Sequence, residues 1–187
     1  KDDFKEIPLP YNIKHETIEL VEMTDHDEIW FCHPDNQYKY DIHNNELKKI
    51  ALWHHHKHIT SIYQNKDKTY FIGTEEGICH VHLKGDTLYP IQTLNTQGAF
   101  NTPRTIYHHE KSNRLIAYSQ ADGMLVYDLT FDQIEYTFPQ LKDFPVTTLC
   151  AYTNNQILIP TRGAGVYLYN LTNGKLKRLF KAVNNEP

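Results

Sequence analysis

The sequence lacks the charge excess and the long apolar run that mark two common classes of protein. Its 187 residues carry 19 Lys and Arg against 23 Asp and Glu, a formal net charge of −4, which gives no electrostatic footprint for duplex DNA or RNA. No stretch approaches the roughly 18 apolar residues of a transmembrane helix, and the first residues lack the apolar core of a signal peptide. We therefore expect no nucleic-acid partner for this segment.

Cysteine is also scarce. Cys32, Cys79 and Cys150 are an odd number and lack the close pairing of metal ligands, so a disulfide framework and a zinc knuckle are both disfavoured. A free cysteine behaves as a small hydrophobic residue. We expect buried free thiols, no structural metal and no cofactor.

The chain does contain an internal repeat. Asn36, Gly77, Gly123 and Gly165 each stand between two strand-like segments, and they are 41, 46 and 42 residues apart. A tight turn between strands favours a residue that tolerates positive φ, which glycine and asparagine do best. A period of about 43 residues is that of a four-stranded propeller blade.

Helical periodicity is absent, and each repeat divides into four short strands bounded by turn residues. The sequence therefore predicts an all-β protein, a β-propeller of four repeats as four-stranded antiparallel blades. A Greek-key sandwich would not place an equivalent glycine every forty-odd residues. The expected blades span residues 16–52, 58–94, 103–138 and 145–181, and residues 3–9 are expected to form an outer strand of a preceding blade.

Four blades fill only part of a common ring, since a seven-bladed ring needs roughly 300 residues at this period. We expect a piece of a larger ring, and a complete four-bladed ring with an N-terminal tail is the alternative. Either arrangement predicts buried inner-strand residues at Ile62, Ile106 and Leu149. It also predicts exposed turn residues, namely Lys66, Lys111 and Asn155.

The second repeat resembles a known family. The segment 59–78, with Ile72-Gly73-Thr74 and the pair Gly77-Ile78, is similar to the two-component regulator propeller repeat, whose consensus has a strand, an acidic turn, Leu-Trp-Ile-Gly-Thr and a Gly-Leu pair. The likeness extends to all four repeats with decreasing quality. Trp30 occupies the tryptophan position in the first repeat, and Lys68 replaces the usual turn glycine in the second.

In that family, such repeats build the extracytoplasmic sensor region of hybrid two-component regulators of Bacteroidetes, which resemble glycan receptors. The resemblance implies a non-catalytic, periplasmic sensing segment that binds a small carbohydrate. Any kinase activity and any membrane attachment would then lie in other parts of the parent protein. Blade edges left open by an incomplete ring would associate with a copy of the chain or with a neighbouring domain.

Histidine clusters raise the possibility of metal binding. The run His54-His55-His56 would direct successive side chains to opposite sides of an extended segment, so at most two face one ion. His80 and His82 share a strand face but have no evident third ligand, and His108-His109 closes a strand. We interpret all of them as structural, and no catalytic motif such as Gly-x-Ser-x-Gly accompanies them.

Loops on one face of a propeller are the expected place for a ligand, because binding residues concentrate on loops that a rigid scaffold displays. Aromatic faces can stack on sugar rings, and guanidinium groups can bind acidic sugars. The predicted ligand-binding residues are Trp53, Phe100, Asn101, Arg104 and Arg162.

Three functions remain open from the sequence. The first is a sensor or ligand-binding propeller. The second is a protein-interaction platform like the WD-repeat propellers, although the Gly-His and Trp-Asp signatures are missing. A propeller enzyme of the lyase or quinoprotein type is the third, and it would need clustered polar groups or cofactor contacts on one face.

Overall fold

The computed structural model describes residues 18, 20–24, 27–33, 36–53, 58–96 and 100–180. Within these ranges the regular structure consists of sixteen β-strands and two single-turn 3₁₀ helices, with no α-helix. The predicted all-β class is therefore confirmed. No helix in the described ranges is long and apolar enough to cross a membrane.

The strands form four consecutive sets of four, which we call units 1 to 4. Unit 1 contains β1 (Leu20–Met23), β2 (Glu28–His33), β3 (Asn36–Asp41) and β4 (Glu46–Leu52). Unit 2 contains β5 (Ile59–Gln64), β6 (Thr69–Thr74), β7 (Gly77–Lys84) and β8 (Thr87–Thr93). Unit 3 contains β9 (Thr105–His109), β10 (Arg114–Ser119), β11 (Gly123–Asp128) and β12 (Gln133–Phe138). Unit 4 contains β13 (Cys150–Thr153), β14 (Gln156–Thr161), β15 (Gly165–Asn170) and β16 (Lys175–Phe180). The 3₁₀ helices are η1 (Glu110–Ser112) and η2 (Pro139–Leu141).

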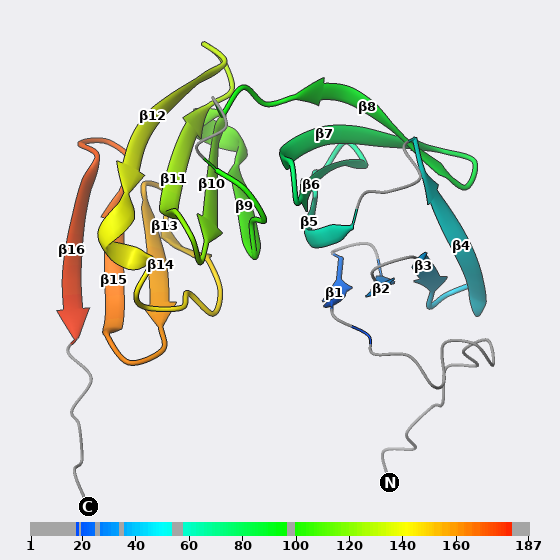
Figure 1. Cartoon of the computed structure of the whole chain (residues 1–187), viewed down its shortest axis with the longest axis horizontal. Coiled ribbons are helices and arrows are strands. Elements are labelled where there is room, and N and C mark those ends of the chain that lie inside the picture. The colour runs from blue at the N-terminus through cyan, green and yellow to red at the C-terminus, as the bar shows by residue number, and fades with distance from the viewer. Residues whose placement is uncertain are drawn as a thin grey trace, which may run out of the picture.

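Consecutive strands within a unit pair antiparallel. Units 3 and 4 are separate four-stranded sheets, whereas units 1 and 2 join through a short parallel pairing of β4 with β8 at Ala51–Thr87 and Leu52–Leu88. Figure 1 shows the units following one another along an arc, with β4 and β16 at its periphery.

The repeated glycines make the turns predicted for them. Gly77, Gly123 and Gly165 have φ angles of 120°, 87° and 91° and begin the third strand of units 2, 3 and 4. Lys68, which replaces a consensus glycine, has φ 66° in the turn between β5 and β6. Because a side chain is costly in this left-handed region, these positions fix where each hairpin turns.

Alternation along the second and third strands gives each unit two apolar faces. We call the side that packs on the preceding unit the backward face, and the other side the forward face. The described residues form one cluster between units 1 and 2 around Trp30 and Ile72. A second lies between units 2 and 3 around Phe71 and Leu125, and a third lies between units 3 and 4. A fourth covers the backward face of unit 1, with Phe31, Tyr38 and Tyr40.

Each buried Leu, Ile or Phe side chain contributes roughly 1.5–3 kcal/mol relative to exposure. The forward face of unit 4 is the exception to this burial. Leu158, Val166 and Leu168 are only half-buried there, and Phe180 is 67% exposed. None of these four residues belongs to a buried cluster formed by the described residues.

The predicted exposures are confirmed. Ile62, Ile106 and Leu149 are 5%, 7% and 7% exposed, and the turn residues Lys66, Lys111 and Asn155 are exposed. Residues 3–9, expected to form an outer strand, lie outside the described ranges.

The first strand of unit 4 starts later than expected. Residues 146–149 pair with β14 only as an isolated bridge between Val146 and Thr161, and regular strand pairing begins at Cys150. Pro160 explains the delay, because it lies in β14 opposite this segment and has no N–H to donate to a ladder. Its carbonyl still accepts a hydrogen bond from the Thr147 N–H at 3.1 Å.

Candidate functional site

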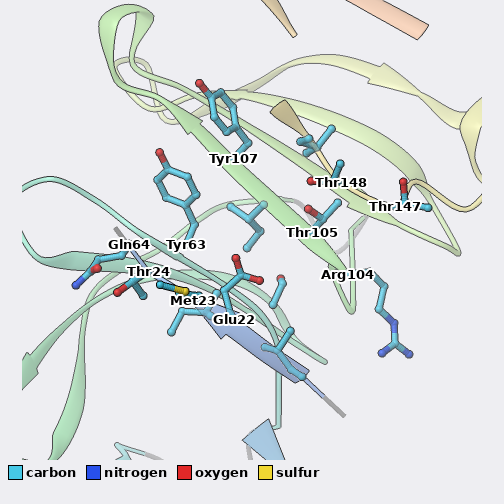
Figure 2. Close-up of a pocket in the computed structure, with 15 residues that line it drawn as sticks. Glu22, Met23, Thr24, Tyr63, Gln64, Arg104, Thr105, Tyr107, Thr147 and Thr148 are labelled. Carbon is cyan, nitrogen blue, oxygen red and sulfur yellow. The ribbon is translucent and has the colours of Figure 1, made fainter. Parts of the chain in front are cut away.

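A polar hollow lies where the first strands of units 1 to 3 meet residues 147–149, the segment that precedes β13 in unit 4. It has a volume of about 350 Å³, and each unit contributes side chains to it. Figure 2 shows Glu22 and Thr105 directed toward its middle and Arg104 at its edge. The lining residues are Leu20, Glu22, Met23, Thr24, Ser61, Ile62, Tyr63, Gln64, Arg104, Thr105, Ile106, Tyr107, Thr147, Thr148 and Leu149.

The walls of the hollow are rich in hydroxyl groups and carry one carboxyl group, from Glu22, and one guanidinium group, from Arg104. Neither forms an ion pair with another described residue. Removal of water around the carboxyl group raises the pKa of Glu22 above its usual value. The hollow therefore offers an acceptor and a cationic donor that are not neutralised within the described parts of the chain.

A second cavity of about 820 Å³ adjoins the first, since Tyr63, Gln64 and Tyr107 line both. The rings of Tyr63 and Tyr107 meet edge to face with their centroids 5.8 Å apart. Tyr152 lines the second cavity and is 61% exposed, so one ring face is open to a ligand. Asn154 and Gln64 add amide groups near these aromatic rings.

Of the five residues predicted from the sequence, only Arg104 lines the hollow. Trp53 is half-buried and packs against the cluster between units 1 and 2. Phe100 is 3% exposed and belongs to the cluster between units 2 and 3, so it offers no face to a sugar. Asn101 and Arg162 are exposed, and their backbone N–H groups donate to Asp122 Oδ2 at 3.1 Å and to the Pro145 carbonyl at 2.8 Å.

The histidines have structural contacts. His80 Nε2 lies 2.9 Å from Thr69 Oγ1, His82 stacks on Tyr89, and His109 Nδ1 lies 2.7 Å from Ser112 Oγ. The described residues contain no group of three His, Cys, Asp or Glu side chains that could hold a metal ion. His54, His55 and His56 lie outside the described ranges.

Sequence reasoning missed most residues of the hollow and of the adjoining cavity, including Glu22, Gln64, Tyr107 and Tyr152. The prediction considered only loop residues, whereas these four side chains come from β1, β5, β9 and β13, the first strand of each unit. Polar residues among the buried positions of those strands, such as Ser61 beside Ile62, were the available signal, because a strand that faces only apolar neighbours has no need of them.

Comparison of the sequence with protein families and with characterised proteins gives no match. Solved structures do resemble the chain. One is the extracellular domain described as that of the hybrid two component system BT3049 from B. thetaiotaomicron, with a TM-score of 0.72 and 18% identity over 95% of this chain and 25% of that one. Another is the extracellular domain of BT4673 from the same organism, with a TM-score of 0.63 and 17% identity over 89% and 23%.

A chain of the Mitotic Checkpoint Complex also matches, with a TM-score of 0.64 and 14% identity over 83% of this chain and 50% of that one. The predicted resemblance to sensor regions of hybrid two-component regulators is confirmed as a likeness of fold. This chain spans about a quarter of the length of the two extracellular domains.

Proposed function

We propose that this chain is a four-blade portion of a larger β-propeller in an extracytoplasmic sensor region, and that it binds a carbohydrate ligand without catalysing a reaction. The observation that carries the proposal is the polar hollow to which all four units contribute, units 1 to 3 through their first strands and unit 4 through residues 147–149 just before β13. A propeller places the inner strand of every blade around one central channel. Each unit is then one blade.

The two ends of the chain support an incomplete ring. The backward face of unit 1 is buried, with Tyr40 2% and Tyr38 5% exposed, whereas the forward face of unit 4 leaves Phe180 67% exposed. A closed four-bladed ring would cover both faces alike. An open apolar blade face needs a partner, and we propose that a further unit of the parent protein or a second copy of this chain covers it.

The chemistry of the hollow suits a sugar. The hollow and the adjoining cavity have volumes of about 350 and 820 Å³, and both fall within the range of roughly 300–1,000 Å³ that is typical of small-molecule sites. Hydroxyl and amide groups can exchange hydrogen bonds with sugar hydroxyls, and the open face of Tyr152 can stack on a pyranose ring. Arg104 can bind a carboxylate or sulfate group of an acidic sugar.

Calorimetric titration of the chain with neutral, uronate-containing and sulfated oligosaccharides tests this function. We expect at least one of them to bind, and we expect Arg104→Ala to weaken an acidic ligand about tenfold, or about 1.4 kcal/mol. Arg162→Ala is the matched control, because Arg162 is equally exposed but lies off the hollow. No binding across the panel, or equal losses in both variants, would overturn the ligand site.

The open forward face of unit 4 has its own test. Light scattering of the chain at increasing concentration should reveal association, and Phe180→Lys should reduce it, because a charge on an apolar contact surface opposes burial. Phe131→Lys is the control, since Phe131 is 72% exposed in the turn after β11. A stable monomer at high concentration would favour a closed four-bladed ring.

A further inference from the structure

The contact between units 2 and 3 contains two histidines at positions where other units carry different residues. The glycines that begin β7, β11 and β15 pair with the last residues of the preceding strands, so the units can be aligned on them. His80 then corresponds to Val126 in unit 3 and to Leu168 in unit 4. In the first two strands of each unit, His108 pairs with Leu115, Gln64 with Tyr70, and Ala151 with Ile157. His108, Gln64 and Ala151 therefore occupy the same repeat position.

Hydrogen bonds determine which nitrogen of His80 carries the proton. Thr69 Oγ1 donates to Asp67 Oδ1 at 2.6 Å, because a carboxylate oxygen can only accept. The Thr69 oxygen therefore accepts a hydrogen bond from His80 Nε2 at 2.9 Å. In a neutral His80 the proton therefore lies on Nε2, and Nδ1 carries the lone pair.

A second set of bonds determines the proton of His108. Asn65 Nδ2 donates to Thr69 Oγ1 at 2.9 Å, which leaves Asn65 Oδ1 as the acceptor for His108 Nδ1 at 2.8 Å. His108 therefore carries its proton on Nδ1. Its Nε2 is buried and has no hydrogen-bond partner among the described residues.

Both imidazoles pack on one aromatic ring and line one cavity. His80 stacks on Phe71 with centroids 4.5 Å apart, and His108 meets the same ring edge-on at 5.2 Å. The cavity between units 2 and 3 has a volume of about 460 Å³. A second proton on either imidazole would place a positive charge inside this contact.

The charged and polar groups facing the two histidines come from several elements. Lys66 and Asp67 lie in the β5–β6 turn, Gln92 in β8, Glu110 in η1, and Asn113 after η1. Lys66 Nζ and Glu110 Oε2 are 2.7 Å apart and neutralise each other. Asp67 favours a charged His80, and Asn113 and Glu110 favour a charged His108, but burial outweighs them and lowers both pKa values below the usual value of 6.5.

We propose that the contact between units 2 and 3 is an acid-sensitive joint, which loosens when His80 and His108 take up protons. A histidine whose pKa is lowered in the packed state stabilises that state above its ordinary pKa. The stabilisation is lost as the pH falls through the lowered pKa, because the separated units bind the proton more tightly. The contact between units 3 and 4 carries Val126 and Ala151 at these positions and does not respond in this way.

Hydrogen-exchange mass spectrometry of the whole chain at pH 7.5 and pH 5.0, with rates corrected for intrinsic exchange, tests the joint. The Thr102 N–H, which donates across the contact to the Thr74 carbonyl at 3.1 Å, should lose its protection several-fold at pH 5.0, because both histidines bind a proton more tightly in the separated units. Amides of β14 and β15 should keep their protection, because they lie in unit 4.

Variants taken from the chain's own repeats complete the experiment. His80→Val installs the residue of unit 3, and His108→Gln installs the residue of unit 2. In the double variant the Thr102 N–H should remain protected at pH 5.0. Each single variant should lose less protection at pH 5.0 than the unchanged protein. The single variants therefore test the joint even if the double variant does not fold. His82→Gln is the control and should retain the full loss. Equal protection of the unchanged protein at both pH values, or an unaltered loss in both single variants, would overturn the joint.

Discussion

The contact between units 2 and 3 and the contact between units 3 and 4 use the same repeat positions but different chemistry. At the first, Thr60 and Ser61 donate to the Pro103 carbonyl at 2.6 and 2.8 Å, and Lys66 pairs with Glu110. At the second, the rings of Tyr136 and Phe138 meet Tyr169 edge to face at 6.4 and 5.5 Å.

One repeat position shows the difference directly. Tyr127 and Tyr169 are both the fourth residue after the aligned glycine, and both are fully buried. The Tyr127 hydroxyl donates to Asp132 at 2.6 Å and accepts from the Asn95 N–H at 3.1 Å. The Tyr169 hydroxyl is buried without a hydrogen-bond partner among the described residues. The repeat therefore places equivalent residues at each contact between units but leaves each contact free to be polar or apolar.

The largest expected effect is the removal of an apolar side chain from the centre of each contact. Phe71→Ala and Ile116→Ala affect the same repeat position in units 2 and 3, and both side chains are at most 2% exposed. We expect losses of about 3–5 kcal/mol for Phe71 and about 2–5 kcal/mol for Ile116 in urea unfolding, because each leaves a cavity. A loss below about 1 kcal/mol at either position would argue against tight packing there.

The next effect isolates the contact of unit 4 with unit 3. Gly174 has φ 65°, and a Cβ built there would lie 2.7 Å from the hydroxyl oxygen and from Cε1 of Tyr136, and closer still to its Cζ. Gly85 has φ 61° and open space around it. Gly85→Ala should cost about 1–2 kcal/mol from backbone strain alone, and Gly174→Ala should cost about 1–3 kcal/mol more. Equal thermal unfolding of the two variants would show that unit 4 packs less closely on Tyr136.

The two tyrosines give a smaller and more selective comparison. Tyr127→Phe should cost about 1–2 kcal/mol, because it leaves the Asn95 N–H and Asp132 without the hydroxyl. Tyr169→Phe should change stability by less than about 0.5 kcal/mol or increase it, since no bond of a described residue is lost. Urea unfolding of both variants at pH 7.5 is the measurement. Equal costs would mean that the Tyr169 hydroxyl has a partner.

The smallest effect concerns the open forward face. Leu158 in unit 4 corresponds to Phe71 and Ile116, but it is only half-buried. Leu158→Ala should therefore cost less than about 1 kcal/mol in this chain. In a longer parent protein whose next unit covers the face, the same change should cost about 2–5 kcal/mol. A large cost in the present chain at low protein concentration would contradict an uncovered face.

Most of the strand pattern could be predicted because its signals are local. Turn residues on both sides limit β6, β10, β14 and β16, for example. The late start of β13 could not be predicted from its own residues. It depends on Pro160, which becomes a neighbour only when β14 pairs with this segment.

The candidate site was less predictable, because its residues meet only after four units have packed. Phe100 illustrates the difficulty: an aromatic residue next to Asn101 suggests an exposed loop, yet its ring is buried between units 2 and 3. Arg104 was predicted among the loop residues, and it lines the hollow because it directly precedes β9. The ligand itself is not encoded in any local motif, so its class stays a proposal.

The parallel pairing of β4 with β8 has a consequence for synthesis on the ribosome. Ala51 and Leu52 pair with Thr87 and Leu88, and the Ala51 N–H donates to the Asp86 carbonyl at 2.8 Å. The β4 edge of unit 1 therefore stays unpaired until the chain has been translated past residue 88. In units 3 and 4, by contrast, every strand of the sheet comes from the same unit. At roughly 5–20 residues per second, unit 1 waits for several seconds with this edge unpaired, and an unpaired strand edge can pair with another chain during that interval.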